Sequence, residues 1–191
     1  MSLPPVSARE SLVRYYRWLR QHGLNDSHSG NASVRDGELV WMTPTGCGAD
    51  TLTTADLLGC RPGQSPPAGA SLDAPLHMAV YAARAGAGAV LHAHCPHAIA
   101  MTLADGDFEP ADFEGRYYFG TVPVLDVAPD DYVSESPARV AAALATHRVC
   151  LVRGHGAYAA DASLDLAYKW LCSLESSARI AWLARAAGIG S

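Results

Sequence analysis

The sequence predicts one α/β domain that spans residues 1–191. Segments with the apolar spacing of helices alternate along the chain with short apolar segments that end in glycine, proline or polar turns. Neither an internal repeat nor a long Pro- or Ser-rich linker divides them, so we expect the elements to share one core. Apolar residues make up 49% of the chain and charged residues 17%, which allows an ordinary core and excludes a disordered chain.

The N-terminal third combines one well-marked helix with a strand and loop-like stretches. Ser7 and Glu10 have the spacing of a capping box, and apolar residues follow at helical intervals up to a glycine, which predicts a helix over 8–22. A Gly-, Asn- and Ser-rich stretch comes next. We then expect a strand over 38–42 that runs into a turn, and a loop over 60–70, where prolines and glycines gather.

The rest of the chain mixes helices and strands. Ser136 and Pro137 have the residue types of an N-cap and a first helical position, so we expect a helix from there to about 147. Residues 105–120 are polar and predict an irregular segment. The other expected elements are helices over 73–84 and 163–187, strands over 88–94, 121–127 and 148–156, and a further strand that begins at 157.

Charge and composition exclude several classes of partner. The net charge is −5 and Lys169 is the single lysine, so we expect no basic surface for nucleic acid or an anionic membrane. No apolar run has the length of a membrane span or the pattern of a signal peptide, so we expect a cytoplasmic protein. Five scattered cysteines without a CxxC pair predict reduced thiols and no thiolate zinc site.

Two histidine motifs indicate a metal site. His92 and His94 lie two apart in an expected strand, so both side chains leave the same face and can converge on one ion. His155 stands between two glycines at the end of another expected strand, where the backbone can turn sharply. Three imidazoles with a free fourth position form a typical catalytic zinc site. An HxH pair alone is a weak signal, because two histidines on one strand face are often only hydrogen-bonded polar residues.

Five segments together make a more specific pattern. In chain order they are "GNASVR" (30–35), "MTPTG" (42–46), "SLDAPLH" (71–77), "HAHCPHA" (92–98) and "RGHGAY" (153–158). Their order and spacing resemble the class II aldolase/adducin family, and within it the sugar-phosphate aldolases. The resemblance covers nearly the whole chain. It implies α/β/α layers around a central, mainly antiparallel sheet, and a homotetramer with active sites between subunits.

The resemblance also implies roles for individual residues. In the family, the HxH pair and the histidine of the "HG" motif bind zinc, here His92, His94 and His155; Mn²⁺ and Co²⁺ suit the same donors. Short donors beside turns form the family's phosphate pocket, here Asn31, Thr45, Gly46 and Ser71. The same threonine, glycine and serine also suit ordinary turn or N-cap positions.

Two positions depart from the aldolase pattern. Leu72 replaces the second serine of a phosphate-binding pair, so a carboxylate-bearing substrate is an alternative to a phosphate ester. Asp73 stands where the aldolases usually carry a glutamate that transfers a proton, and an aspartate there resembles the related ribulose-5-phosphate 4-epimerases. An alternative role for Asp73 is to interact with the dipole of the helix that follows it.

A second acid is needed for the oxygen that leaves. The family's aldolases take a tyrosine from an adjoining subunit, and Tyr117 and Tyr118 lie in roughly the right region. The motif does not align well enough to choose between them. Simple aromatic packing is the alternative for both.

We therefore expect a zinc-dependent aldolase. It would cleave a small ketose phosphate to dihydroxyacetone phosphate and an aldehyde through a metal-bound enediolate. Alternative reactions at the same site are 4-epimerisation of a ribulose-5-phosphate-like sugar, and dehydration or decarboxylation of a sugar-acid derivative. An adducin-like interaction module without catalysis is the alternative from another class, but the intact histidine triad beside Asp73 argues against it.

Overall fold

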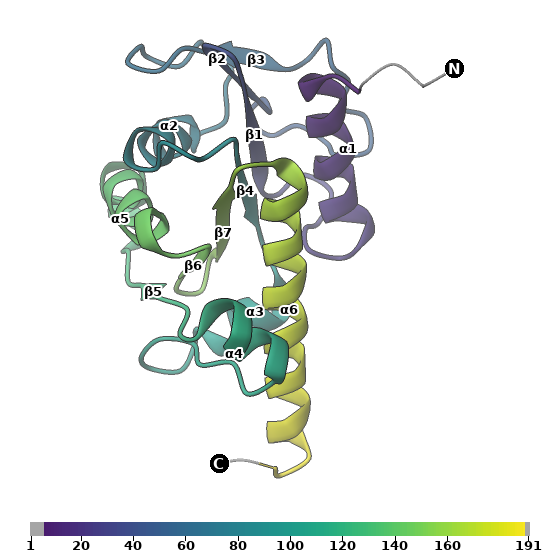
Figure 1. Cartoon of the computed structure of the whole chain (residues 1–191), viewed down its shortest axis with the longest axis vertical. Coiled ribbons are helices and arrows are strands. Elements are labelled where there is room, and N and C mark those ends of the chain that lie inside the picture. Colours follow the sequence, from purple (N-terminus) through teal and green to yellow (C-terminus); the bar gives the residue numbers. More distant parts are fainter. Residues whose placement is uncertain (1–5, 190–191) are drawn as a thin grey trace.

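Residues 6–189 are described by the computed structural model, and in them seven strands form one sheet with six α-helices around it (Figure 1). The helices are α1 (Ala8–Gln21), α2 (Ala74–Ala83), α3 (Pro96–Met101), α4 (Phe113–Phe119), α5 (Tyr132–Thr146) and α6 (Leu164–Ala186). The strands are β1 (Asn31–Asp36), β2 (Leu39–Met42), β3 (Leu58–Cys60), β4 (Ala89–Ala93), β5 (Val124–Leu125), β6 (Val149–Val152) and β7 (Gly156–Asp161).

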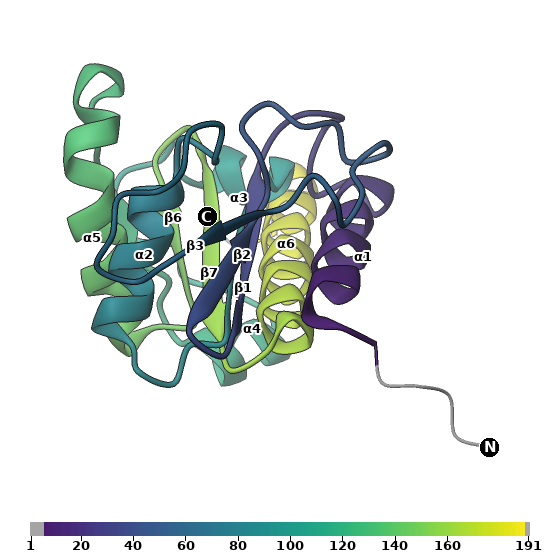
Figure 2. The ribbon, with the colours of Figure 1, turned by 90° about the horizontal axis from the view of Figure 1, so that it is seen from above.

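The sheet is almost entirely antiparallel. Its strand order is β3-β2-β1-β4-β7-β6-β5, and of the neighbouring pairs only β5 and β6 run parallel. Helices α2 and α5 cover one face, and α1 and α6 cover the other (Figure 2). The expected layered α/β/α fold with a mainly antiparallel sheet is thus confirmed.

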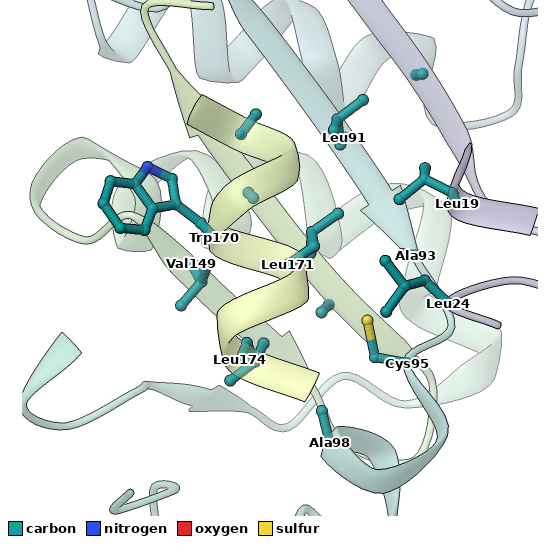
Figure 3. Close-up of a cluster of buried hydrophobic side chains, with 14 of the residues drawn as sticks. Leu19, Leu24, Leu91, Ala93, Cys95, Ala98, Val149, Trp170, Leu171 and Leu174 are labelled. Carbon is teal, nitrogen blue, oxygen red and sulfur yellow. The ribbon is translucent and has the colours of Figure 1, made fainter. Parts of the chain in front are cut away.

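The face of the sheet toward α6 is an apolar core. Helix α6 buries a stripe at helical spacing, and in Figure 3 Leu171 lies on the side of Leu91, whereas Trp170 and Leu174 lie on the side of Val149. Ser163 caps the helix by accepting a hydrogen bond from the N–H of Leu166, as Ser and Thr do at helix starts. Burial of this stripe explains why the periodicity of residues 163–187 predicts the helix well.

Strand register places a polar row on the opposite face. Asn31, His92 and Tyr158 are direct neighbours across β1, β4 and β7, so their side chains share the face toward α2 and α5. The adjacent row points the other way, into the apolar core. The side chains of the polar row are therefore available for a site at one end of β4, while the neighbouring residues pack in the core.

The expected helices differ from those of the structure in two places. Residues 105–120 are not irregular throughout, because α4 forms there: Asp112 accepts a hydrogen bond from the N–H of Gly115, and the helix packs against α6. Helix α5 begins at Tyr132, after a 3₁₀ turn, and not at Ser136. Pro137 lies inside α5 and has no N–H to donate to the carbonyl of Val133, four residues earlier.

The strands also differ from expectation at the edges. The strand expected over 121–127 is reduced to Val124–Leu125. Strands β1 and β3 and the short helix α3 have no counterpart among the expected elements. Strand β1 alternates Ala32 and Val34 with polar residues that face α2, where Ser33 contacts His77 and Tyr81, so composition alone makes it look like a loop.

Two further findings concern the cysteines and the apolar content of the helices. All five cysteines are free thiols. None of the helices in residues 6–189 is both long and apolar enough to cross a membrane.

Candidate metal centre and its pocket

Three imidazole nitrogens meet at one end of the sheet. Nε2 of His92 lies 3.1 Å from Nε2 of His94 and 3.1 Å from Nε2 of His155. The ligand atoms of the three side chains all lie within 4.8 Å of one another. The structure thus brings together the three histidines that the sequence singled out as metal ligands, from one strand end and a turn far apart in the chain.

Strand register and two glycines produce this convergence. His92 belongs to β4, and His94 follows it just beyond the end of the strand. His155 lies in the turn between β6 and β7, where Gly154 has a φ of +66° that favours glycine. Gly156 provides space, because a Cβ there would lie 2.8 Å from Cε1 of His92 and 3.0 Å from Cδ2 of His94.

The histidines are neutral, with nitrogen lone pairs free for a cation. Nδ1 of His92 donates to the carbonyl oxygen of Ala157 at 3.0 Å, which leaves Nε2 unprotonated. Burial lowers the pKa of His92 to about 3. Burial also lowers the pKa of His94, and burial together with the neighbouring imidazole of His94, beside which a second positive charge is unfavourable, lowers the pKa of His155. Neutral imidazole is the form that binds metals.

The spacing of the nitrogens fits a tetrahedral ion. Zinc–nitrogen bonds of about 2.0–2.1 Å in a tetrahedron place two ligand nitrogens roughly 3.3 Å apart. The observed separations of 3.1 Å need only small side-chain adjustments to reach that value. Within residues 6–189, this is the only group of three or more His, Cys, Asp or Glu side chains close enough to share a metal.

Asp73 is a buried carboxylate beside the three histidines. It occupies the N-cap position of α2, but its side chain makes no capping hydrogen bond, which argues against a purely helix-stabilising role. Instead it accepts hydrogen bonds from Nδ2 of Asn31 at 2.9 Å and from the hydroxyls of Tyr132 at 2.8 Å and Tyr158 at 3.0 Å. Burial acts to raise the pKa of Asp73, but His92 and the Asn31 hydrogen bond outweigh it and lower the pKa.

A small pocket of about 190 Å³ opens over this group. It is lined by the three histidines and Asp73, by the expected phosphate-binding residues, and by three others; in full, His92, His94, His155, Asp73, Asn31, Thr45, Gly46, Ser71, Gly30, Leu72 and Tyr132. Gly46 is exposed at the mouth, whereas Ser71 is buried and its Oγ accepts a hydrogen bond from the N–H of Asp73. Leu72 is 60% exposed, so it adds an apolar patch at the mouth of the pocket.

Two expected site residues lie away from the pocket in the structure. Tyr117 and Tyr118 are on α4 and do not line the pocket. Tyr117 is 76% exposed, and the ring of Tyr118 packs edge-on against Trp170 of α6 at a centroid distance of 5.4 Å. Neither tyrosine serves the metal centre of its own chain. A role in the site of a neighbouring subunit stays a prediction.

Two other tyrosines join the site, and the sequence reasoning missed both. The ring of Tyr158 stacks on His92 with centroids 4.1 Å apart, and that of Tyr132 stacks on His155 at 4.7 Å. A signal existed for Tyr158, because the alternation of β7 puts it on the same face as His92. Tyr132 gave no such signal, because the start of α5 was expected four residues later.

Comparison with known proteins identifies the family. The profile of the "Class II Aldolase and Adducin N-terminal domain" matches residues 10–182. The chain belongs to this family. The match extends from α1 into α6 and so spans all seven strands of the sheet and the three histidines.

Curated relatives within the family divide between two reactions. A methylthioribulose-1-phosphate dehydratase of Bradyrhizobium sp. (strain BTAi1) is 33% identical over 173 residues, which cover 81% of this chain and 80% of the relative. An L-fuculose phosphate aldolase of Escherichia coli O6:H1 is 30% identical over 156 residues, 78% of this chain and 70% of the relative. Both relatives act on ketose phosphates. Membership of the family therefore does not by itself tell whether this chain cleaves a carbon–carbon bond or removes water.

A solved structure shows the same fold. The crystal structure of an L-fuculose-1-phosphate aldolase from Thermus thermophilus superposes with a TM-score of 0.88 at 35% sequence identity. The superposition covers 97% of this chain and 99% of that chain. The class II aldolase family is therefore shown by sequence and by fold together.

Proposed function

We propose that this protein is a metal-dependent aldolase that reversibly cleaves a small ketose phosphate to dihydroxyacetone phosphate and an aldehyde. The observation that carries the proposal is the meeting of three neutral imidazole nitrogens, with Nε2 of His92 3.1 Å from each of the other two, beside the buried Asp73 in a pocket of about 190 Å³. Imidazole and carboxylate groups arranged in this way serve metal-assisted proton transfer next to a carbonyl.

His92, His94 and His155 would hold the ion, which we take to be zinc, with Mn²⁺ or Co²⁺ as substitutes. Bound there, a divalent cation supplies a Lewis acid for neighbouring carbonyl and hydroxyl oxygens of the substrate. The protein contributes three neutral ligands, which leave the full double charge of the ion available. It also contributes a turn rich in glycine that lets substrate approach His155 closely.

Asp73 would carry the proton at the reacting carbon. Its pKa is held below the ordinary value, so it is ionised at neutral pH and ready to accept a proton. In the direction of synthesis it would remove the proton from the carbon of dihydroxyacetone phosphate next to the carbonyl, and in cleavage it would return that proton. Tyr117 or Tyr118 of a neighbouring subunit is our candidate for the acid at the aldehyde oxygen, within a cytoplasmic homotetramer.

The phosphate would bind at the mouth of the pocket. Asn31, Thr45 and Ser71 offer amide and hydroxyl groups there, and the backbone N–H of Gly46, in a turn with a φ of +62°, would join them. Leu72 offers no donor and is exposed at the same mouth, so we expect phosphate affinity below that of a site with two serines. A carboxylate on the substrate is the alternative anion.

Dehydration of a ketose phosphate is the second candidate reaction. The 33% identity with a methylthioribulose-1-phosphate dehydratase over 81% of the chain favours it. The same ionised carboxylate would then remove a proton while a hydroxyl group leaves from the neighbouring carbon, so the two reactions share their first requirement. They differ in their products.

A substrate panel separates these functions. Zinc-loaded protein is incubated with fuculose 1-phosphate, methylthioribulose 1-phosphate, ribulose 5-phosphate and non-phosphorylated sugar acids, and the products are followed by NMR. We expect dihydroxyacetone phosphate and an aldehyde from at least one ketose 1-phosphate. Loss of water without carbon–carbon cleavage would establish the dehydratase instead. Turnover of the sugar acids alone would contradict the phosphate pocket, and no turnover together with no affinity for metal would favour an interaction module.

A further inference from the structure

The carboxylate of Asp73 is tied to three different elements of the fold. Asn31 on β1 and Tyr158 on β7 donate to Oδ2, and Tyr132 at the start of α5 donates to Oδ1. The hydroxyls of the two tyrosines also touch each other. A carboxylate has about four acceptor positions, two on each oxygen; with both hydroxyl protons directed to Asp73 and not to the other tyrosine, three donors leave one position, on Oδ1, for a proton. The hydrogen bonds therefore select which oxygen stays available.

The same two tyrosines contact the histidines. Tyr158 stacks on His92 with an interplanar angle of 8°, and Tyr132 stacks on His155, also at 8°. The hydroxyl oxygen of a tyrosine is fixed in the plane of the aromatic ring, so its position follows from the position of the ring. Each tyrosine thus spans from an imidazole to an oxygen of Asp73, and the two rings fix the position of the carboxylate relative to the imidazole nitrogens.

Burial strengthens this arrangement. Asp73 is 5% exposed and Tyr158 is fully buried, whereas Tyr132 is half-buried and lines the pocket. Water therefore has little access to replace the hydroxyl of Tyr158, and hydrogen bonds in such surroundings reinforce one another. A carboxylate without these donors would be free to rotate about its side-chain bonds.

We propose that Tyr132 and Tyr158 are positioning residues for Asp73: their hydroxyls hold the carboxylate in the one orientation that lets Oδ1 face the reacting carbon. This inference rests on the proposed function, since it assigns the proton transfer to Asp73. It requires neither tyrosine to transfer a proton itself. It places the positioning groups within the same chain as the histidines.

Steady-state kinetics of zinc-loaded Tyr132→Phe and Tyr158→Phe test the proposal. Phenylalanine keeps the ring that stacks on the histidine and removes only the hydroxyl. We expect kcat to fall roughly 10- to 100-fold in each variant, as is typical when a reacting group is misplaced, while KM changes less than about twofold and zinc content stays the same. A kcat within about twofold of wild type in both variants would overturn the proposal.

Tyr81→Phe is the matched control. Tyr81 is also a buried tyrosine whose hydroxyl bonds to a side chain of β1, Ser33, at 2.9 Å, but it does not line the pocket. Its loss should lower thermal stability and leave kcat unchanged. If Tyr81→Phe lowered kcat as much as Tyr132→Phe does, the effect would be a general consequence of losing a buried hydroxyl and the positioning role would be wrong.

A second measurement does not depend on turnover. Crystal structures of zinc-loaded wild type and of Tyr132→Phe should show Asp73 in a single rotamer in the wild type and rotated, or in two rotamers, in the variant. An unchanged Asp73 in the variant would overturn the proposal even if activity fell. If the wild type turned over none of the substrates in the panel, the proposed function would fail, whereas this structural comparison would still decide the positioning claim.

Discussion

Two adjacent rows of the same three strands have opposite characters. Asn31, His92 and Tyr158 form one row across β1, β4 and β7 on the face toward α2 and α5. One residue away, Ala32, Leu91 and Ala159 form the next row and point into the core against α6. The alternation of a strand thus separates chemistry from packing by a single residue.

The difference between the rows shows which part of the molecule sets which property. The side chains of the apolar row need no specific hydrogen-bond partners and only have to fill the core, so many combinations of apolar residues would serve there. The polar row needs partners from distant segments: Asp73 from the start of α2 and Tyr132 from α5 complete its hydrogen bonds. We therefore expect changes in the polar row to affect activity and changes in the apolar row to affect stability.

Asp73→Asn should give the largest effect. The amide keeps the shape of the side chain but cannot accept a proton at neutral pH, so we expect kcat to fall by about 10²- to 10⁴-fold, the usual contribution of a general base. Zinc content, measured by metal analysis, should stay equal to that of the wild type because the three ligands are unchanged. An active Asp73→Asn variant would remove this residue from the mechanism.

Leu91→Ala tests the apolar row. Leu91 is fully buried against α6, and its truncation leaves a cavity, so the free energy of unfolding should fall by about 2–5 kcal/mol. The measurement is chemical denaturation of the metal-free protein, which avoids the contribution of bound zinc. The folded variant should still bind zinc. Loss of the metal site without loss of stability would contradict the division between the two rows.

The pH dependence of stability tests whether His77 of α2 is buried in its neutral form. Burial lowers the pKa of His77 to about 4 from its ordinary value of 6.5. The unfolded chain then binds a proton that the folded chain excludes, so the free energy of unfolding falls between pH 6.5 and pH 4, by about 3 kcal/mol from this group. Denaturation of metal-free His77→Gln should show a correspondingly weaker pH dependence. Equal slopes in both proteins would mean that His77 is not buried in its neutral form.

Gly156→Ala should have a smaller effect on function. The added Cβ would lie 2.8 Å from the backbone oxygen of Ala93 and from Cε1 of His92, and 3.0 Å from Cδ2 of His94, so the backbone at the end of β4 and both imidazoles must shift. We expect zinc affinity, measured by competition with a chelator, to fall roughly 10- to 100-fold. Gly86→Ala is the control, because a Cβ at Gly86 would meet no atom within 4 Å. Equal affinities in the two variants would contradict the tight packing around the histidines.

Much of the fold follows from periodicity in the sequence. Helices α1 and α6 and strands β4 and β7 are predicted because their apolar faces are buried against one another. Strand β1 is not, because Asn31 and Ser33 are polar residues that pack by hydrogen bonding to α2 and the site. Helix α4 has a local signal in its N-cap Asp112, but it also depends on contact with α6, which no local pattern shows.

The site shows the same limit. The strand spacing of His92 and His94 and the glycines around His155 predict the ligands, because these signals are local. The family resemblance adds the residues of the pocket, which the structure brings to one place. Tyr132 could not be predicted, because its place depends on how α5 is packed against α2 and β7. Contacts between distant segments decide such residues.

Metal analysis of the purified protein and of His155→Ala tests the central claim most directly. After dialysis against zinc and removal of the excess, the wild type should hold about one ion per chain at the three-histidine site. His155→Ala should hold little or none, because two imidazoles alone bind zinc weakly. Wild-type protein that stays metal-free under these conditions, or a variant that binds zinc equally well, would contradict the account.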